Sequence, residues 1–288
     1  MAAFGLVTVA AAGPAQGQSI PFADTEDATL SEIDVKDGSR DWHPVVTFDI
    51  RNGDYARGAL DDDDAALDRL PIHFALGGAL VVRRGRDGEG DLFVIGQSSN
   101  GFHAPRADER IAPRAWYESN NLLGLAWRPV AGLTTAASYT IKTSPNGVAS
   151  TTHEASVSIF YTADRGLGRW KPRAAITRRT QGEGGLYTIA GISPSFALSG
   201  RKDGLSLGVP VLVGIGWNDF YAEGSGTRVY GSGGFTLAHP VKLGGSAATL
   251  QADFLALVRD NRLRRLDAPG GTTATVVPHA TVSLTMAW

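Results

Sequence analysis

The stretch that decides the fold is PHATVSLTMAW, residues 278 to 288. Apolar side chains occupy alternate positions from Val282 to Trp288, and small polar side chains from Thr281 to Thr285 lie between them. Because successive side chains of a strand point to opposite faces, this strand has one apolar and one polar face. An alternating strand with a final aromatic residue is typical of the last strand of an outer-membrane β-barrel. We therefore expect this segment to contact outer-membrane lipid and to be recognised by the barrel-assembly machinery.

The same period of two recurs along the chain, and it is clearest from Leu205 to Trp217. There every second residue is apolar over the length that a tilted strand needs to cross a bilayer. About twelve such segments predict an all-β, transmembrane, antiparallel, up-and-down barrel. They are Val45–Arg51, Ile72–Arg83, Asp91–Ser99, Asn121–Arg128, Leu133–Lys142, Glu154–Thr162, Trp170–Arg179, Tyr187–Ser199, Leu205–Trp217, Arg228–His239, Thr249–Arg259 and the C-terminal strand.

The connections between these segments alternate in length, as in bacterial barrels with long external loops and short periplasmic turns. The segments 52–71, 100–120, 143–152, 218–227 and 260–277 are expected to be external loops. The segments 129–132, 200–203 and 242–248 are expected to be turns. A soluble lipocalin-like barrel or sandwich is the alternative, but it would have to bury both the apolar stripes and the polar residues between them.

The composition limits which classes of protein and of binding partner are compatible with the chain. The chain has 288 residues, of which 19% are charged, and its formal net charge is -2. The charge balance indicates no nucleic-acid partner. Cysteine is absent, so neither a disulfide framework nor a thiolate metal site is predicted.

The N-terminus predicts a secretory signal over residues 1–17, with an apolar core from Phe4 to Ala12. No Lys or Arg precedes that core, which suggests that Met1 lies inside a longer signal; a short buried helix is the alternative. Residues 18–41 are polar and acidic and are expected to form a periplasmic segment. The barrel is then expected to span residues 42–288, in the bacterial outer membrane.

The polar faces of the predicted strands carry more basic than acidic groups. Rings of charge inside a pore select solutes of opposite sign, so we expect a mild preference for anions. The alternative is that these charges pair and fill a narrow lumen, because buried charges are tolerated chiefly when they are partnered. The expected lumen residues are Asp49, Arg51, His73, Arg83, Lys142, Glu154, Lys171, Arg173, Arg179, Asp253, Arg259 and His279.

Tryptophans fall near the ends of the predicted strands, where aromatic girdles of membrane barrels lie. We expect membrane-interface positions for Trp127, Trp170, Trp217 and Trp288.

Three motifs lie in or beside the predicted strands: Trp116-Tyr117-Glu118, Tyr139-Thr140 followed by Thr143 to Gly147, and Asn218 to Tyr221. Together they resemble a family of uncharacterised outer-membrane barrel proteins from Gram-negative bacteria, over roughly Leu92 to the C-terminus. The segment Gly53-Asp54-Tyr55-Ala56-Arg57-Gly58 also resembles a short element of related barrels that contains Tyr and Arg-Gly. The resemblance implies fold and location, and no catalytic residue.

An esterase is a third hypothesis. The segment Gly96 to Phe102 resembles the His-x-Ser-Asn-Gly element of outer-membrane phospholipase A, with Ser99 at the nucleophile position. Gln97 replaces the required histidine, and glutamine cannot accept the serine proton. His103 follows four residues after Ser99, so it would have to fold back to act as the base. We therefore expect no enzyme activity.

No cofactor or metal site is expected. The six histidines show no spacing that builds one. The acidic run Asp61 to Asp64 can bind calcium, but a solvated charge run is the more common situation. We expect this run to pair with Arg262, Arg264 and Arg265 of the last loop, its neighbour in a closed barrel.

These observations favour an outer-membrane barrel that is a narrow passive channel for small, anionic solutes. The competing class is a structural or interaction barrel with a closed lumen that acts through its loops or its periplasmic segment.

Overall fold

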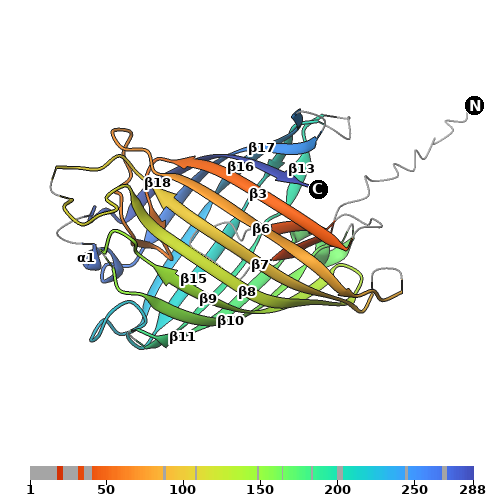
Figure 1. The fold of residues 1–288 in the computed structure, drawn as a ribbon, viewed down its shortest axis with the longest axis horizontal. Helices are drawn as coiled ribbons and strands as arrows, with labels where there is room; N and C mark the ends of the chain where they lie inside the picture. Colours follow the sequence, from red (N-terminus) through yellow and green to blue (C-terminus); the bar gives the residue numbers. More distant parts are fainter. Residues whose placement is uncertain are drawn as a thin grey trace, which may run out of the picture.

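A computed structural model describes residues 18–21, 32–35 and 41–288, apart from 87, 88, 108, 148, 164, 183, 200–203, 244, 245 and 268–270. It contains a closed, twelve-strand antiparallel β-barrel, which confirms the predicted fold class (Figure 1). The strands are β3 (Trp42–Arg51), β6 (Ile72–Arg83), β7 (Asp91–Phe102), β8 (Trp116–Val130), β9 (Leu133–Thr143), β10 (Thr152–Tyr161), β11 (Arg173–Gln181), β12 (Gly185–Ile192) with β13 (Ser195–Ala197), β14 (Ser206–Gly208) with β15 (Val211–Trp217), β16 (Arg228–Leu243), β17 (Ser246–Arg259) and β18 (Val276–Ala287).

The barrel closes because its first and last strands pair with each other. β18 lies antiparallel to β3, with Leu284 opposite Phe48 and Thr285 opposite Thr47. The Thr47 and Thr285 hydroxyls hydrogen-bond at 3.1 Å. β3 and β18 therefore each have a paired neighbour on both sides, as closure of a barrel requires in a medium without water.

Two barrel strands are interrupted where the sequence predicts continuous ones. β12 and β13 are separated at Pro194, and β14 and β15 are separated at Pro210. Proline has no N–H for the ladder, so it interrupts the regular pairing. Val209 still donates to the Pro194 carbonyl at 2.9 Å, so the two interruptions lie side by side and the wall stays closed.

β7 and β8 extend further toward the long loops than expected. Their pairing runs up to Phe102 opposite Trp116, whereas alternation in the sequence ends near Ser99 and Asn121. Polar residues occupy both faces of this part, so the period-two pattern is lost although the ladder continues. The loop between them therefore spans only residues 103–115.

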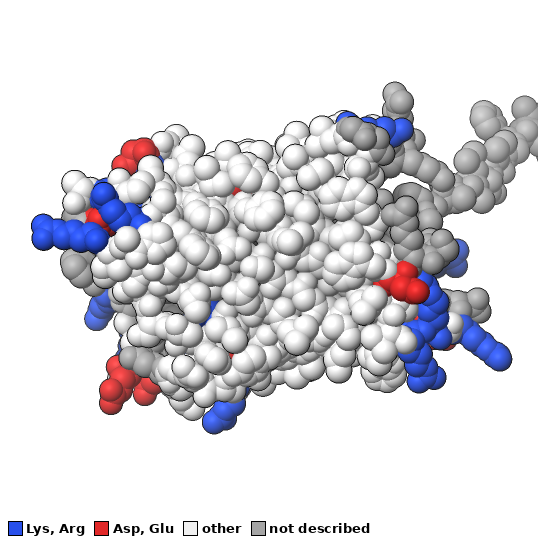
Figure 2. All heavy atoms as spheres, viewed as in Figure 1, with Lys and Arg blue, Asp and Glu red and all other residues white. Residues whose placement is uncertain are grey.

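The outside of the barrel is apolar over most of its height. Large hydrophobic side chains such as Phe74, Leu123, Val157 and Phe254 are exposed on the outward faces of the strands. On the face shown in Figure 2, most Lys, Arg, Asp and Glu side chains lie toward the two ends of the barrel, and the broad belt between them is almost uncharged. This distribution is the reverse of that of a soluble barrel, which buries its apolar faces.

The lumen is packed rather than hollow along much of its wall. One buried cluster is formed by Phe93, Ile95, Leu122 and small alanines of β6 to β9. A second cluster joins Tyr187 and Tyr230 of the wall to Tyr55, Phe220 and Leu263, which come from three different loops at one end of the barrel. We use "long-loop end" for the end that carries α1 (Leu263–Leu266) and "short-turn end" for the opposite end (Figure 1).

The predicted signal, residues 1–17, lies outside the described residues. Within the following segment, β1 (Gln18–Pro21) pairs with β2 (Glu32–Val35) as an antiparallel hairpin. β1 lies beside β9 and β10, and β2 lies beside β6. In the described part of the chain, no helix has the length and hydropathy needed to cross a membrane.

Candidate functional site

The segment that joins β3 to β6, residues 52–71, folds into the barrel instead of standing above it. It contains a two-residue hairpin, β4 (Tyr55–Ala56) and β5 (Ala59–Leu60). Its tip uses Arg57 and Gly58 with positive φ values of 52° and 84°. We call residues 52–71 loop 1.

The tip of loop 1 reaches the opposite wall through Arg57. Its guanidinium donates to both oxygens of Glu154 on β10, at 2.7 and 2.5 Å. Arg57 and Glu154 are both buried. Lys142 Nζ and Arg179 Nη2 also lie 3.9 and 3.4 Å from the Glu154 carboxylate. Three cations therefore surround one carboxylate in the lumen, and we call these four residues the Glu154 cluster.

Aromatic rings hold the Arg57 side chain in this position. Its guanidinium carbon lies 4.9 Å from the ring centre of Tyr187 and 5.2 Å from that of Phe220. The Tyr221 hydroxyl donates to the Arg57 carbonyl at 2.7 Å. Cation–π contacts are strongest when desolvated, as here, so the loop tip is fixed by packing as well as by charge.

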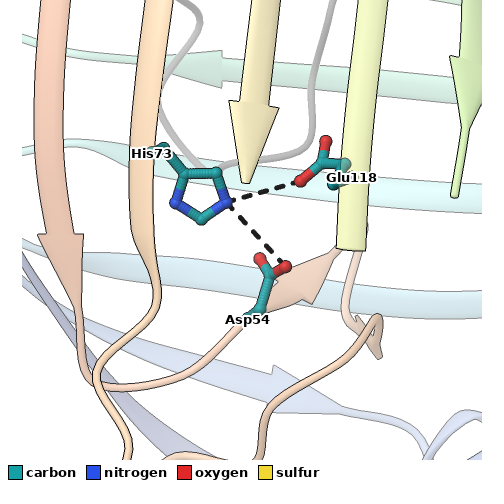
Figure 3. Close-up of side chains that lie close together, drawn as sticks. All are labelled: Asp54, His73 and Glu118. Atoms are coloured by element: carbon teal, nitrogen blue, oxygen red, sulfur yellow. Dashed lines mark ion pairs between the residues drawn. The ribbon is translucent and has the colours of Figure 1, made fainter. Parts of the chain in front are cut away.

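A second buried cluster lies where loop 1 leaves β3. The Asp54 and Glu118 carboxylates point toward the same ring nitrogen of His73 (Figure 3). His73 Nε2 is 3.9 Å from Asp54 Oδ2 and 3.4 Å from Glu118 Oε2. The Tyr117 hydroxyl is 2.7 Å from the same nitrogen. The three ligand-type atoms of Asp54, His73 and Glu118 lie within 4.8 Å of one another.

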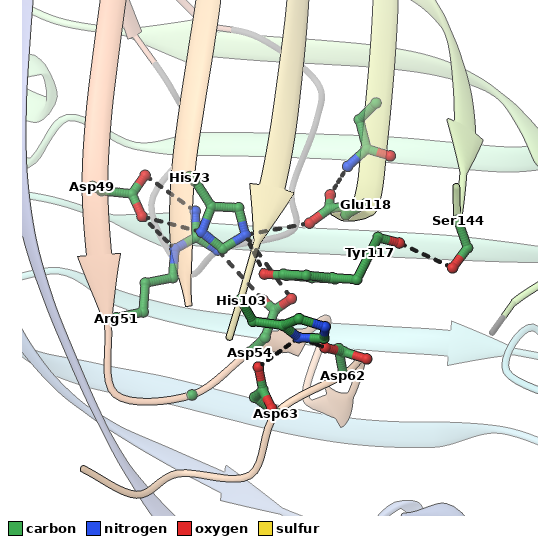
Figure 4. Close-up of polar contacts among 12 residues, drawn as sticks. Asp49, Arg51, Asp54, Asp62, Asp63, His73, His103, Tyr117, Glu118 and Ser144 are labelled. Carbon is green, nitrogen blue, oxygen red and sulfur yellow. Dashed lines mark hydrogen bonds and ion pairs between the residues drawn. The ribbon is translucent and has the colours of Figure 1, made fainter. Parts of the chain in front are cut away.

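A third cluster ties loop 1 to the segment after β7. His103 Nδ1 lies 2.5 Å from Asp62 and 3.1 Å from Asp63, and Nε2 donates to the Arg114 carbonyl at 3.1 Å. Figure 4 shows the His103 ring beside Tyr117, and the two rings stack with centroids 4.7 Å apart. Burial alone would lower the pKa of His103, but the hydrogen bonds to Asp62 and Asp63 outweigh it and raise the pKa to about 9.

Loop 1 meets the last loop through different residues from those that the sequence indicates. The Leu60 N–H donates to Asp267 at 3.0 Å, and Asp267 also pairs with Arg259. Arg264 donates to the Thr273 carbonyl instead of an aspartate of loop 1. The predicted pairing of the acidic run with Arg262, Arg264 and Arg265 is therefore replaced by the His103 contacts and by Asp267.

The structure places the twelve expected lumen residues in different environments. Those buried are Asp49, Arg51, His73, Glu154, Arg173, Asp253 and Arg259. Lys142, Arg179 and His279 are partly buried, and His279 lies 3.1 Å from the Gly53 carbonyl of loop 1. Lys171 precedes β11, where it ends the 3₁₀ turn η1 (Gly166–Trp170) with a φ of 47°.

Arg83 is exposed, and the structure does not place it in the lumen. The pairing of β6 with β7 shifts between Val81 and Arg83, so that Arg83 lies opposite Leu92. Leu92 in turn pairs with Trp127, which is half exposed on the outside of the barrel. A bulge moves the following side chain to the other face, and no signal in the alternation reveals it.

The four expected interface tryptophans, Trp127, Trp170, Trp217 and Trp288, are all exposed. Trp127, Trp170 and Trp288 lie toward the short-turn end of the barrel, whereas Trp217 ends β15 at the long-loop end. Trp217 Nε1 donates to the Thr188 hydroxyl at 2.9 Å, and Trp288 Nε1 donates to Ser246 at 2.9 Å.

The residues of the clusters that sequence reasoning missed are Asp54, Arg57, Tyr117 and Glu118. They lie in segments expected to be external loops. A signal was present, because Asp54 to Gly58 and Trp116 to Glu118 are two of the motifs that carry the family resemblance. Their inward positions follow only from the closed barrel.

The fold does not bring His103 into the role of base that the serine hypothesis needs. Ser99 and Gln97 lie on β7 opposite Ala75 and Gly77 of β6. His103, the nearest histidine in sequence, has its two ring nitrogens in contact with Asp62, Asp63 and the Arg114 carbonyl. The proton acceptor that a serine nucleophile needs is therefore not supplied by His103.

No protein-family model matches the chain, and no curated protein is similar to it. Among solved structures, LpxR from Salmonella typhimurium is similar at 11% identity and a TM-score of 0.44, covering 84% of this chain and 99% of that one. A bacterial polysaccharide outer membrane secretin has 9% identity and a TM-score of 0.45, with coverages of 87% and 99%. OprB from Pseudomonas putida has 10% identity and a TM-score of 0.34, with coverages of 86% and 92%. The similar structures are outer-membrane β-barrels, but likeness at this level carries no argument about function.

Proposed function

We propose that the protein lies in the bacterial outer membrane and is a narrow passive channel for small, anionic solutes. The broad belt of exposed hydrophobic side chains supports the location, because its counterpart in membrane barrels contacts lipid. On this proposal β18 is the strand that the barrel-assembly machinery recognises.

One observation carries the choice of solute. The Glu154 cluster places Arg57, Lys142 and Arg179 around a single carboxylate inside the lumen. Cations therefore outnumber carboxylates in this contact set, and an excess of one sign of charge in a constriction favours ions of the opposite sign.

Loop 1 sets the size limit of the path. Its tip crosses the lumen to β10 and is held there by the bidentate Arg57–Glu154 pair. A solute that passes this level must pass beside the tip or displace it. We infer a low conductance for the wild-type protein and a larger one when the tip is released.

The test compares single-channel conductance of the refolded wild-type protein and Arg57→Ala in a planar bilayer under a salt gradient. We expect discrete anion-preferring steps from the wild type and steps at least about twofold larger from Arg57→Ala. Arg262→Ala is the matched control, since Arg262 is an exposed arginine of the last loop.

The second candidate is a closed-lumen barrel that acts through its loops or its periplasmic segment. It is favoured by the buried apolar clusters inside the wall and by the pairing of the lumen charges. If neither the wild type nor Arg57→Ala conducts ions, although folded protein is present in the bilayer, the closed-lumen barrel is the better description. An esterase has the least support, and turnover of a p-nitrophenyl ester that disappears in Ser99→Ala would be needed to restore it.

A further inference from the structure

We propose that Asp54, His73 and Glu118 form a binding site for a divalent transition-metal ion of the zinc class. Asp54 comes from loop 1, whereas His73 and Glu118 come from the wall strands β6 and β8. A bound ion would therefore fasten loop 1 to the barrel wall.

The register of three neighbouring strands brings His73 and Glu118 close together. His73 lies opposite Gly101 of β7, and Gly101 lies opposite Glu118 of β8. Gly101 has no side chain between them. A Cβ at this position would lie 3.0 Å from His73 Nε2 and 2.6 Å from the Tyr117 ring. The glycine thus allows the Tyr117 hydroxyl and His73 Nε2 to lie close to the β7 backbone, between the strands that carry His73 and Glu118.

His73 is held in the form that binds metals. Its Nδ1 lies 3.3 Å from Asp49 Oδ1, and Arg51 Nε donates to the same carboxylate at 2.7 Å. A carboxylate beside Nδ1 favours the proton there, and the lone pair of Nε2 then faces the Tyr117 hydroxyl, Asp54 and Glu118. Nε2 is the atom that faces Asp54 and Glu118. This is the carboxylate–histidine arrangement found behind many zinc ligands.

The two carboxylates are oriented in the same way. Arg51 Nη1 lies 3.5 Å from Asp54 Oδ1, and Asn120 donates to Glu118 Oε1. In each case the other oxygen, Asp54 Oδ2 or Glu118 Oε2, is the one that faces His73 Nε2. A lone pair and two carboxylate oxygens repel one another, and a cation among them turns the repulsion into attraction.

The spacing and donor set select the kind of ion. Metal–ligand bonds of about 2.0–2.2 Å place the ligand atoms of a tetrahedral zinc site roughly 3.3–3.6 Å apart. His73 Nε2 is 3.4 Å from Glu118 and 3.9 Å from Asp54. A neutral imidazole nitrogen favours zinc over calcium, which takes oxygen ligands. Tyr117 Oη, 2.7 Å from Nε2, lies at hydrogen-bond distance and is closer than two ligands of one zinc ion would be.

The His103 cluster has a similar composition, two aspartates and a histidine, but its histidine is placed differently. His103 Nε2 donates to a carbonyl and Nδ1 faces two carboxylates, so both ring nitrogens act as donors. Arg69 pairs with Asp63 as well. Because both ring nitrogens of His103 donate, the ring presents no lone pair to an ion.

The effect on the channel rests on the proposed function, whereas the binding site does not. Asp54 is three residues from Arg57, which closes the constriction. An ion that fixes Asp54 to the wall would hold the tip of loop 1 in its closed position. Zinc is therefore expected to lower conductance from the long-loop side.

The experiment titrates the full refolded barrel with Co²⁺ and records its visible absorption, followed by displacement with Zn²⁺. We expect a single equivalent of tetrahedral Co²⁺ that Zn²⁺ displaces. His73→Gln and Glu118→Gln should weaken binding at least about tenfold, and Asp49→Asn should weaken it about 10–100-fold through loss of ligand orientation. Gly101→Ala should also weaken binding, because the added methyl group would displace Tyr117 and His73 Nε2.

Two control variants change residues of the same types as the proposed ligands, a histidine and an aspartate, at positions outside the site. His153→Gln removes a histidine that bonds to Tyr139 outside the lumen, and Asp68→Asn removes an exposed carboxylate of loop 1. Both should bind Co²⁺ like the wild type, and circular dichroism identifies any variant that fails to fold. No Co²⁺ or Zn²⁺ binding by the folded wild type, or unchanged binding by folded His73→Gln, overturns the site.

The two proposals fail separately. If Co²⁺ binds but no variant conducts ions, the channel proposal is rejected and the metal site stands. Conductance that is insensitive to Zn²⁺, together with no bound Co²⁺, removes the metal site and leaves the channel.

Discussion

Arg57 and Glu154 are 97 residues apart in the chain and form a bidentate ion pair inside the barrel. The pair joins the tip of loop 1 to β10, far around the barrel from β3 and β6, the strands that the loop connects. Because both side chains are buried, removal of either one leaves charge inside the lumen without its main partner.

A double-mutant cycle measures this contact. Arg57→Ala, Glu154→Gln and the double variant are compared by denaturant unfolding in the same lipid. We expect a coupling free energy of roughly 0.5–3 kcal/mol, because the two groups touch directly. Strict additivity of the two single effects would show that the loop tip is held by packing alone.

The sign of the lumen charge can be reversed. The double variant Arg173→Glu and Arg179→Glu replaces two basic groups of β11 and is expected to turn the anion preference into a cation preference. The reversal potential under a salt gradient is the measurement. The control Arg83→Glu replaces an exposed arginine with glutamate and should leave the reversal potential unchanged. Equal effects of the two changes would contradict the assigned faces.

The contact between loop 1 and His103 should depend on pH. The pKa of His103 is raised from 6.5 to about 9, so the folded protein favours the protonated ring. Its contribution to stability is complete below pH 6.5 and is lost as the pH rises through about 9. Limited proteolysis of loop 1 is therefore expected to accelerate between pH 7 and 10. In His103→Gln the rate should be nearly independent of pH over this range.

Gly58 tests how closely the loop tip fits the wall. Its φ is 84°, and a Cβ would lie 2.5 Å from Tyr230 Cγ. We expect Gly58→Ala to destabilise the barrel by about 1–3 kcal/mol and to raise conductance. Gly224→Ala carries a similar φ of 71° with open space around it, so it reports backbone strain alone. Similar losses in both variants would mean that the Tyr230 contact contributes little.

The apolar belt predicts the cost of an outward charge. Leu123 is 66% exposed near the middle of β8, and Leu167 is 68% exposed in η1 at the short-turn end. In a lipid bilayer Leu123→Arg should cost about 2–4 kcal/mol of unfolding free energy, and Leu167→Arg about 0–1 kcal/mol. If both changes are neutral, the belt does not face lipid.

The strands were predictable because alternation is a local property of the sequence. Ile72–Arg83 is observed with the expected bounds, and the pattern of β18 sets its pairing with β3. The bulge before Arg83 was not predictable, since a single extra residue changes the face without changing the composition.

The clusters in the lumen were not predictable in the same way. His73 and Glu118 become neighbours only through the registers of β6, β7 and β8, and Asp54 joins them only because loop 1 turns inward. Sequence spacing cannot show this, because the contacts join positions far apart in the chain. The tip of the inward-turned loop contacts the opposite wall where Arg57 meets Glu154.

Pairing of β3 with β18 also sets the order in which the molecule can be assembled. The first strand of the barrel is synthesised early, and its free edge is covered only when the last strand has been made. Closure of the barrel therefore depends on contacts between strands that are far apart in the sequence. A chain that stops before Val276 would leave β3 and β17 as open edges, each a template for the wrong partner.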